Sequence, residues 1–188
     1  MEQLRQRIQK ITEFQTLSDA QKISALKDIG IKSVPEPEDW HRKNYPNLNI
    51  NCHAYAFGLG SSDQYRNIAW SDACQRLNKF FANFAFIEFV LSTTTLEEIS
   101  APLKGGLILY FDETGKPKHT GIILQATPSI KVRSKWGTIA IFEHEALSQA
   151  PANYGDIVKY YSPLDIVSAE KIFLDYVATI KSQTEVVA

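Results

Sequence analysis

The sequence predicts an α+β fold. Its N-terminal half carries apolar side chains at helical spacing, whereas residues 106–161 consist of short apolar runs separated by turn residues. Helices followed by a run of strands are typical of helices packed on an antiparallel sheet. The chain has 188 residues, of which 44% are hydrophobic, so it is long enough to form one domain with a good-sized core.

Residues 1–44 are predicted to be a helical appendage that ends in a linker. The first helix has a single apolar face, formed by Leu4, Ile8 and Ile11. A second helix is expected after Ser18, because Ser18 and Gln21 have the spacing of a capping box. The proline-containing run 32–49 is then expected to be extended.

The middle of the chain is predicted to contain two core helices. The first spans residues 52–59, and the second spans residues 72–81 with Ser71 as its cap. Residues 82–91 form an apolar run that suits either a buried helix or a strand. A short helical turn is expected at residues 96–99.

The second half is predicted to form an antiparallel meander. Its strands are expected at residues 106–111, 119–124, 130–134, 138–142 and 156–161. Residues 112–115 have the composition of a hairpin turn between the first two strands. An amphipathic helix is expected to close the chain over residues 166–188.

Two residues have the chemistry of a nucleophile and its base. Cys52 comes directly before an apolar helix, and the unpaired N–H groups and positive pole of a helix start are expected to lower the pKa of its thiol. His119 opens a strand in the second half. A cysteine at a helix start and a histidine at the mouth of a strand form a Cys/His pair. Taken singly, a cysteine is more often a small buried hydrophobe, and a histidine a hydrogen-bonded surface group.

These segments resemble the papain-like superfamily in its compact NlpC-type and CHAP-type amidase form. The resemblance rests on Cys52 and on the segments 105–110 and 119–123. It implies a papain-like catalytic domain over residues 45–165, in which the cysteine begins a core helix packed on an antiparallel sheet. It also implies that Cys52 is the attacking thiolate and that His119 is the general base.

The resemblance has two departures and extends to one further segment. The third catalytic position, on the strand after the histidine strand, is usually His, Asn, Gln or an acidic residue, but residues 132–137 offer no clear match. The NlpC-type motif usually has aspartate directly before the cysteine, whereas this chain has Asn51. The segment 134–155 is similar to a subgroup of uncharacterised bacterial proteins. That similarity implies no activity.

The third catalytic residue, which would orient His119, is open among three residues. Ser134 is able to accept the imidazole N–H, although a neutral hydroxyl stabilises an imidazolium less well than a carboxylate does. Lys135 has no acceptor when charged and is expected instead to bind a substrate carboxylate. His144 is a more distant alternative.

An acyl-transfer site also needs donors for an oxyanion and walls for its substrate. The backbone N–H of Cys52 and a side-chain amide from Asn49 or Asn51 are the expected donors, with simple helix capping as the alternative for the asparagines. Trp136, expected in a loop beside the site, is predicted to be a wall residue.

Composition argues against several classes of function. The net charge is −1 and there is no long basic block, so the charge pattern of a nucleic-acid-binding protein is missing. The densest apolar stretch, residues 80–91, is too short to cross a bilayer, and no apolar signal core is present. We therefore expect no nucleic-acid or membrane partner, and a protein that is cytoplasmic or exported by a specialised secretion machine. Cys52 and Cys74 are the only cysteines and lack zinc spacing, so no metal is expected.

The sequence thus predicts a thiol hydrolase, an amidase or peptidase that needs no cofactor. By the resemblance, its substrate is a peptide or isopeptide bond, with peptidoglycan as one source. Three alternatives stay open: a papain-like binding module without activity, a transamidase or deamidase-type effector, and a structural or immunity-type protein. The sequence indicates no oligomeric state.

Overall fold

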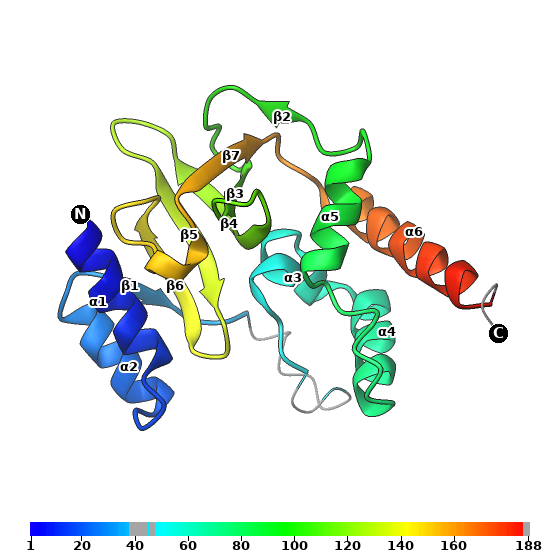
Figure 1. Cartoon of the computed structure of the whole chain (residues 1–188), viewed down its shortest axis with the longest axis horizontal. Coiled ribbons are helices and arrows are strands. Elements are labelled where there is room, and N and C mark those ends of the chain that lie inside the picture. Colours follow the sequence, from blue (N-terminus) through cyan, green and yellow to red (C-terminus); the bar gives the residue numbers. More distant parts are fainter. Residues whose placement is uncertain (38–44, 46–47, 186–188) are drawn as a thin grey trace.

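The structure is a computed structural model that describes residues 1–37, 45 and 48–185. Its centre is a seven-stranded antiparallel sheet with helices on both faces (Figure 1). The helices are α1 (Glu2–Glu13), α2 (Asp19–Lys27), α3 (Cys52–Ala56), α4 (Asp63–Cys74), α5 (Phe84–Ser92) and α6 (Ile166–Glu185), with short 3-10 helices η2 (Leu59–Ser61) and η3 (Ala152–Tyr154). The strands are β1 (Lys32–Val34), β2 (Glu98–Ile99), β3 (Leu107–Phe111), β4 (Pro117–Gln125), β5 (Lys131–Trp136), β6 (Ala140–Glu145) and β7 (Ile157–Tyr161). The predicted α+β class is confirmed.

The strands lie in the order β1-β6-β5-β4-β3-β7-β2. Strands β3 to β6 form the predicted meander, and β7 returns to pair with the free side of β3. Because successive side chains of a strand point to opposite faces, the sheet has two distinct faces. We call the face that packs against α3, α5 and α6 the α3 face, and the face that packs against α1, α2 and η3 the η3 face.

The N-terminal segment is joined to this sheet. Strand β1 pairs with β6 and so forms one edge. Helix α2 begins with the predicted capping box, in which Ser18 and Gln21 each bond the other's backbone. Of the predicted linker 32–49, residues 38–44 and 46–47 lie outside the described part of the chain.

A buried arginine ties α1 to the segment around η3. The Arg5 guanidinium donates to the carbonyl oxygens of Ala150 and Gly155, at 3.2 and 3.0 Å, and pairs with the carboxylate of Asp156. The partners of Arg5 are remote from it in the sequence. A buried guanidinium needs such partners to offset its lost hydration. Helix α1 is therefore fixed to the domain rather than hanging from it.

The second core helix lies earlier in the chain than predicted. Helix α4 begins after Ser62, whose hydroxyl accepts the Tyr65 N–H at 3.0 Å, so the predicted helix over 72–81 is wrong in position. Asp72 is in the last turn of α4, and its carboxylate accepts the Phe80 N–H at 2.9 Å. The cap is therefore Ser62, and Ser71, the predicted cap, lies inside the helix.

Two short segments are also settled by the structure. The ambiguous run 82–91 is helix α5, which Asn83 caps by accepting two backbone N–H groups. Residues 96–99 contain strand β2 rather than a helical turn, because pairing with β7 satisfies their backbone groups at the far edge of the sheet.

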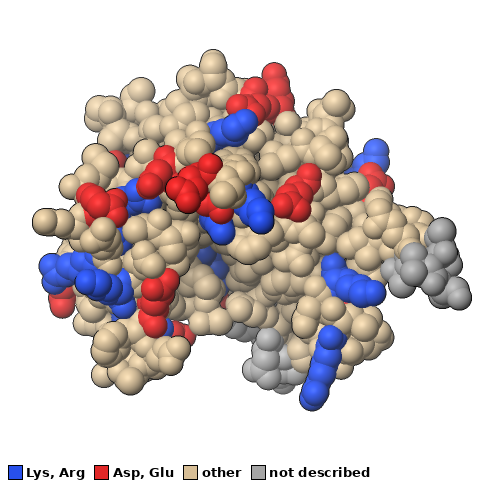
Figure 2. All heavy atoms as spheres, viewed as in Figure 1, with Lys and Arg blue, Asp and Glu red and all other residues tan. Residues whose placement is uncertain are grey.

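In the described residues, no helix combines the length and the apolar character needed to cross a membrane. Acidic and basic side chains are mixed over the face of the molecule seen in Figure 2.

Candidate active site

Asn51 and Cys52 together form the start of α3. The Asn51 side-chain oxygen accepts the Ala54 N–H at 2.9 Å, and its amide nitrogen donates to the Ala82 carbonyl at 2.7 Å. The structure therefore gives Asn51 the capping role that was the alternative to an oxyanion donor. Asn49, the other predicted donor, is exposed. Helix α3 ends at Ala56, earlier than the predicted helix over 52–59.

The Cys52 thiol is held in its neutral form. Burial raises the pKa of this thiol to about 11. Three effects lower the pKa, namely the Thr120 N–H, the N–H groups at the helix start and the Lys135 charge, but burial outweighs them. The expected lowering of this pKa is therefore wrong in net direction. The forces that sequence position predicted are present, but removal of the thiolate from water dominates them.

His119 lies on β4 and faces the η3 side of the sheet. It is paired across the ladder with Tyr110, and its ring stacks on that of Tyr154 with centroids 3.7 Å apart and planes 13° from parallel. Only 2% of His119 is exposed, and its Nε2 atom has no hydrogen-bond partner among the described residues. Burial, together with the charges of His144 and His53, keeps the imidazole pKa well below its ordinary value of 6.5.

Cys52 and His119 lie near the same stretch of β4, but on different sides of it: α3 packs on the α3 face, whereas the His119 ring lies on the η3 face. Helix α3 packs against β4 and β5, and the Thr120 backbone N–H acts on the Cys52 thiol. Burial raises the pKa of Tyr154, and the charge of Cys52 raises it further, so the thiol and the stacked rings share one electrostatic environment. Within the described part of the chain, however, no hydrogen bond joins the Cys52 sulfur to the His119 ring.

Ser134, Trp136 and His144 form a separate network on the η3 face. The His144 Nδ1 atom lies 2.9 Å from the Glu145 carbonyl, which only accepts, so Nδ1 carries the proton. The His144 Nε2 atom then accepts from the Ser134 hydroxyl at 2.9 Å, and that hydroxyl accepts from Trp136 Nε1, also at 2.9 Å. The Ser134 hydroxyl thus donates to His144 and accepts from Trp136, and its role as the orienter of His119 stays a prediction without a contact to support it.

Trp136 is a core residue and not a wall of the site. It is the last residue of β5, only 1% of it is exposed, and its ring lies against those of Phe142 and Tyr154. The prediction placed it in a loop because Gly137 follows it. Strand alternation instead directs its side chain into the η3 face beside Ser134.

Lys135 points the other way, into the α3 face. Its ammonium donates to the Gly137 carbonyl at 2.9 Å and to the Glu36 carboxylate at 2.8 Å, and its side chain is 3% exposed. This charge acts on Cys52 by lowering the pKa of the thiol. The predicted carboxylate-binding residue therefore does hold a carboxylate, one that belongs to the chain itself.

His53 supports α3 against the sheet. Its Nδ1 lies 2.8 Å from the Thr120 hydroxyl, and its ring meets that of Phe84 edge-on. Burial lowers the pKa of this imidazole to about 4. Thr120 and Glu36 are not among the predicted site residues. Thr120 is inside the segment 119–123 and could have been found there, but Glu36 joins the site only through the fold.

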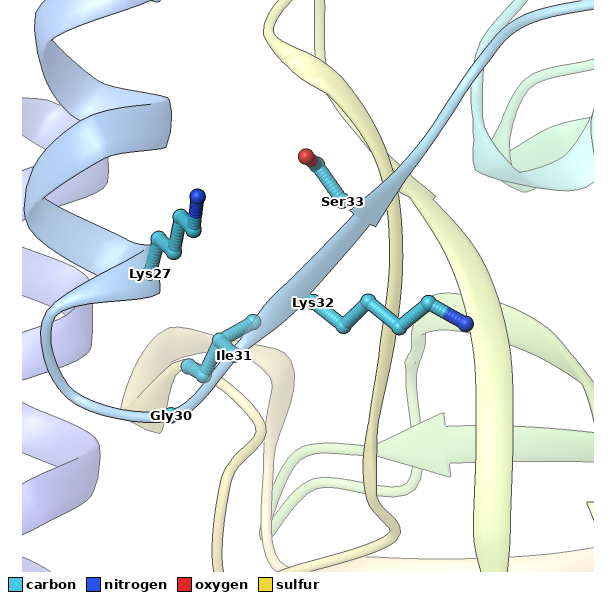
Figure 3. A pocket seen from close by; sticks show the side chains of 5 residues that line it. All are labelled: Lys27, Gly30, Ile31, Lys32 and Ser33. Atoms are coloured by element: carbon cyan, nitrogen blue, oxygen red, sulfur yellow. The ribbon is translucent and has the colours of Figure 1, made fainter.

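Groups of acidic, histidine or cysteine side chains able to hold a metal are missing from the described residues. A pocket of about 370 Å³ lies between the end of α2 and β1. Its lining residues are Lys27, Gly30, Ile31, Lys32 and Ser33 (Figure 3). The Lys32 ammonium turns out of it and pairs with Glu143 on β6 at 3.0 Å. This pocket is open and separate from Cys52.

One protein family matches the central part of the chain. It is described as a domain of unknown function, DUF7689, and the match covers residues 44–162. That range contains Cys52, His119 and Lys135 but leaves out Glu36. No curated protein and no solved structure matches the chain.

Proposed function

The chain belongs to the DUF7689 domain family, and from its site we propose that it is a papain-like thiol hydrolase that cleaves an amide bond, with Cys52 as nucleophile and His119 as base. The observation that supports this most is the unpaired Nε2 of a fully buried imidazole next to the strand position that contacts the thiol. A buried polar atom without a partner costs about 1–3 kcal/mol. A proton acceptor must keep a lone pair free, and the unpaired Nε2 meets that requirement.

The directions of the two pKa shifts define how such a reaction starts. A raised thiol pKa and a lowered imidazole pKa leave both groups neutral at rest. The sulfur attacks the carbonyl carbon of the substrate while its proton passes to the free nitrogen of His119. When the C–N bond breaks, His119 returns that proton to the leaving amine, and water then hydrolyses the thioester.

Helix α3 brings the thiol to the α3 face, whereas the imidazole lies on the η3 face, so this sequence of steps requires the two groups to approach beside Thr120 when substrate binds. Catalytic hydrogen bonds are often long or misaligned in unliganded enzymes and tighten in the complex. The stack on Tyr154 fixes the plane of the His119 ring in the meantime. The proposed substrates are peptide or isopeptide bonds, with peptidoglycan as one source, and the compartment stays a prediction.

The test uses p-nitrophenyl acetate as an acyl donor and mass spectrometry to locate the acetyl group. We expect Cys52 to be acetylated faster than the exposed Cys74 at pH 8, in spite of the raised pKa of its thiol. His119→Ala should slow acetylation of Cys52 by about 10²-fold or more, the usual contribution of a general base. Cys74 reports the ordinary thiol reactivity in the same molecule.

A second candidate is a binding module that keeps the fold without the reaction. The neutral, partly buried thiol and the missing bond between Cys52 and His119 favour it. Equal acetylation of Cys52 and Cys74, unchanged by His119→Ala in a folded protein, would support this candidate and rule out the hydrolase. A transamidase or deamidase shares the first step and would give the same result as the hydrolase.

A further inference from the structure

The Lys135 ammonium is a buried charge with two acceptors. It donates to the Gly137 carbonyl and to the Glu36 carboxylate, and almost none of its side chain is exposed. A buried ammonium is strongly destabilising if its anionic partner is removed, so this position must hold an anion whenever the domain is folded. The carboxylate of Glu36 supplies it in this structure.

Lys135 lies on the face of the sheet that carries the nucleophile. Helix α3, which begins with Cys52, packs on β4 and on β5, the strand of Lys135. The adjacent face position on β5 is Arg133, which interacts with Tyr55 of α3. The ammonium is close enough to Cys52 for its charge to favour the thiolate. An acyl group on the sulfur would therefore have the ammonium as a neighbour.

The two partners of the ion pair come from different parts of the chain. Lys135 is inside the family match over 44–162, whereas Glu36 precedes it. The lysine is thus part of the domain that carries the nucleophile, and the glutamate is brought to it by the segment that follows β1. Glu36 keeps 26% of its side chain exposed, so it is the outer member of the pair.

We propose that Lys135 is the carboxylate-binding residue of the site, that Glu36 occupies it as an internal ligand, and that the substrates are acyl donors with a carboxylate beside the scissile bond. The claim about substrates rests on the proposed function, but the binding of a carboxylate by Lys135 does not depend on catalysis. Exchange of one carboxylate for another keeps the ammonium paired throughout. The exchange therefore avoids the cost of an uncompensated buried charge.

The experiment compares two alkylating probes of similar size, iodoacetate with a carboxylate and iodoacetamide without one. The quantity measured is the ratio of their rates at Cys52, divided by the same ratio at Cys74. This double ratio cancels the thiolate fraction of each cysteine and the intrinsic reactivity of each probe. The variants are Glu36→Gln and, as a matched control, Glu143→Gln, which removes a glutamate that pairs with Lys32 and Arg133 on the same face.

We expect Glu36→Gln to raise the double ratio by about tenfold, the scale of attraction between opposite charges at a partly buried site. Glu143→Gln should leave it unchanged. Glu36→Gln leaves the ammonium without its anionic partner and destabilises the fold. The double variant Glu36→Gln/Lys135→Gln removes both charges and should give a double ratio near one. An unchanged ratio in folded Glu36→Gln, or a raised ratio that survives in the double variant, would overturn the proposal.

The outcome is independent of the base. His119→Ala in the Glu36→Gln background should change both alkylation rates alike and leave the double ratio raised. A raised ratio together with slow, His119-independent acetylation would mean a carboxylate-binding site without hydrolase activity. Normal acetylation with an unchanged ratio would mean a hydrolase whose substrates need no carboxylate.

Discussion

At the scale of single residues, Cys52 shows where sequence position and tertiary structure oppose each other. The helix start, the nearby N–H groups and the Lys135 charge all lower the pKa of its thiol, as position predicts. Burial raises the pKa by more, to about 11. The depth of a side chain below the surface depends on segments remote in the chain, so local sequence does not reveal this larger effect.

This shift predicts the pH dependence of alkylation. The rate of iodoacetamide reaction at Cys52 should keep rising past the ordinary thiol pKa of 9.0 and reach its midpoint near pH 11, because only the thiolate reacts. Quenched time points analysed by peptide mass spectrometry give the profile for each cysteine. A plateau at Cys52 below pH 9 in the native protein would show that the helix start, and not burial, controls the thiol.

Some site residues are predictable from their neighbours in the sequence, whereas others depend on contacts between distant segments. Cys52 at a helix start and His119 on the return strand follow from neighbouring residues, and the structure has both. Ser134 and His144 were proposed separately as orienters and prove to bond each other. That pairing depends on the register of β5 with β6, which no local pattern fixes.

At the scale of elements, the packing of β5 against β4 explains why residue 121, two residues after His119, is a glycine. An added Cβ at Gly121 would lie 2.4 Å from Val132 Cγ1 and 3.3 Å from Ser134 Cβ. Strand β5 therefore approaches β4 too closely for any side chain at this position. The same close approach brings the Ser134 strand beside the strand of His119.

Gly121→Ala should accordingly destabilise the protein by about 1–3 kcal/mol, the usual cost of overpacking. Chemical denaturation followed by circular dichroism measures it. Gly115→Ala is the control, because nothing lies within 4 Å of its added Cβ and only its φ of 78° resists substitution. We expect a loss of about 1 kcal/mol there. A Gly121→Ala protein as stable as the wild type would mean that β4 and β5 separate easily.

Elements with several agreeing signals were predicted well. Helix α2 has a capping box, and the meander has turn residues between apolar runs, and both are confirmed. Helix α4 is misplaced by the prediction, because its cap is Ser62, whereas the predicted cap Ser71 lies inside the helix. Strand β2 has only two residues and is defined by its pairing with β7. The two strands are about 60 residues apart in the sequence, so no local pattern predicts β2.

At the scale of the whole molecule, three buried histidines make the fold sensitive to acid. Burial lowers the pKa of His53 and of His144 to about 4, and that of His119 well below 6.5. The unfolded chain binds protons at these rings below about pH 6.5, whereas the folded chain does not. The stabilisation is therefore complete above that pH and is lost as pH falls towards 4.

Between pH 7.5 and pH 5 the expected loss is about 2 kcal/mol for each of His53 and His144, because pH 5 lies about 1.5 units below the ordinary histidine pKa and each unit is worth about 1.4 kcal/mol. Urea unfolding at pH 7.5 and at pH 5 measures the difference. His53→Gln keeps a hydrogen-bonding group near Thr120 but does not titrate, so it should show a smaller difference than the wild type. Equal stability of the wild type at both pH values would show that water reaches these rings.

The anchoring of α1 by Arg5 has a practical consequence for work on this family. A fragment cut to the matched range 44–162 would lose β1, Glu36 and the guanidinium that holds the carbonyls on either side of η3. Tyr154, which belongs to η3, would then lose part of the scaffold that keeps it stacked on His119. The span by which relatives are recognised is thus narrower than the unit that must be expressed to obtain an intact site.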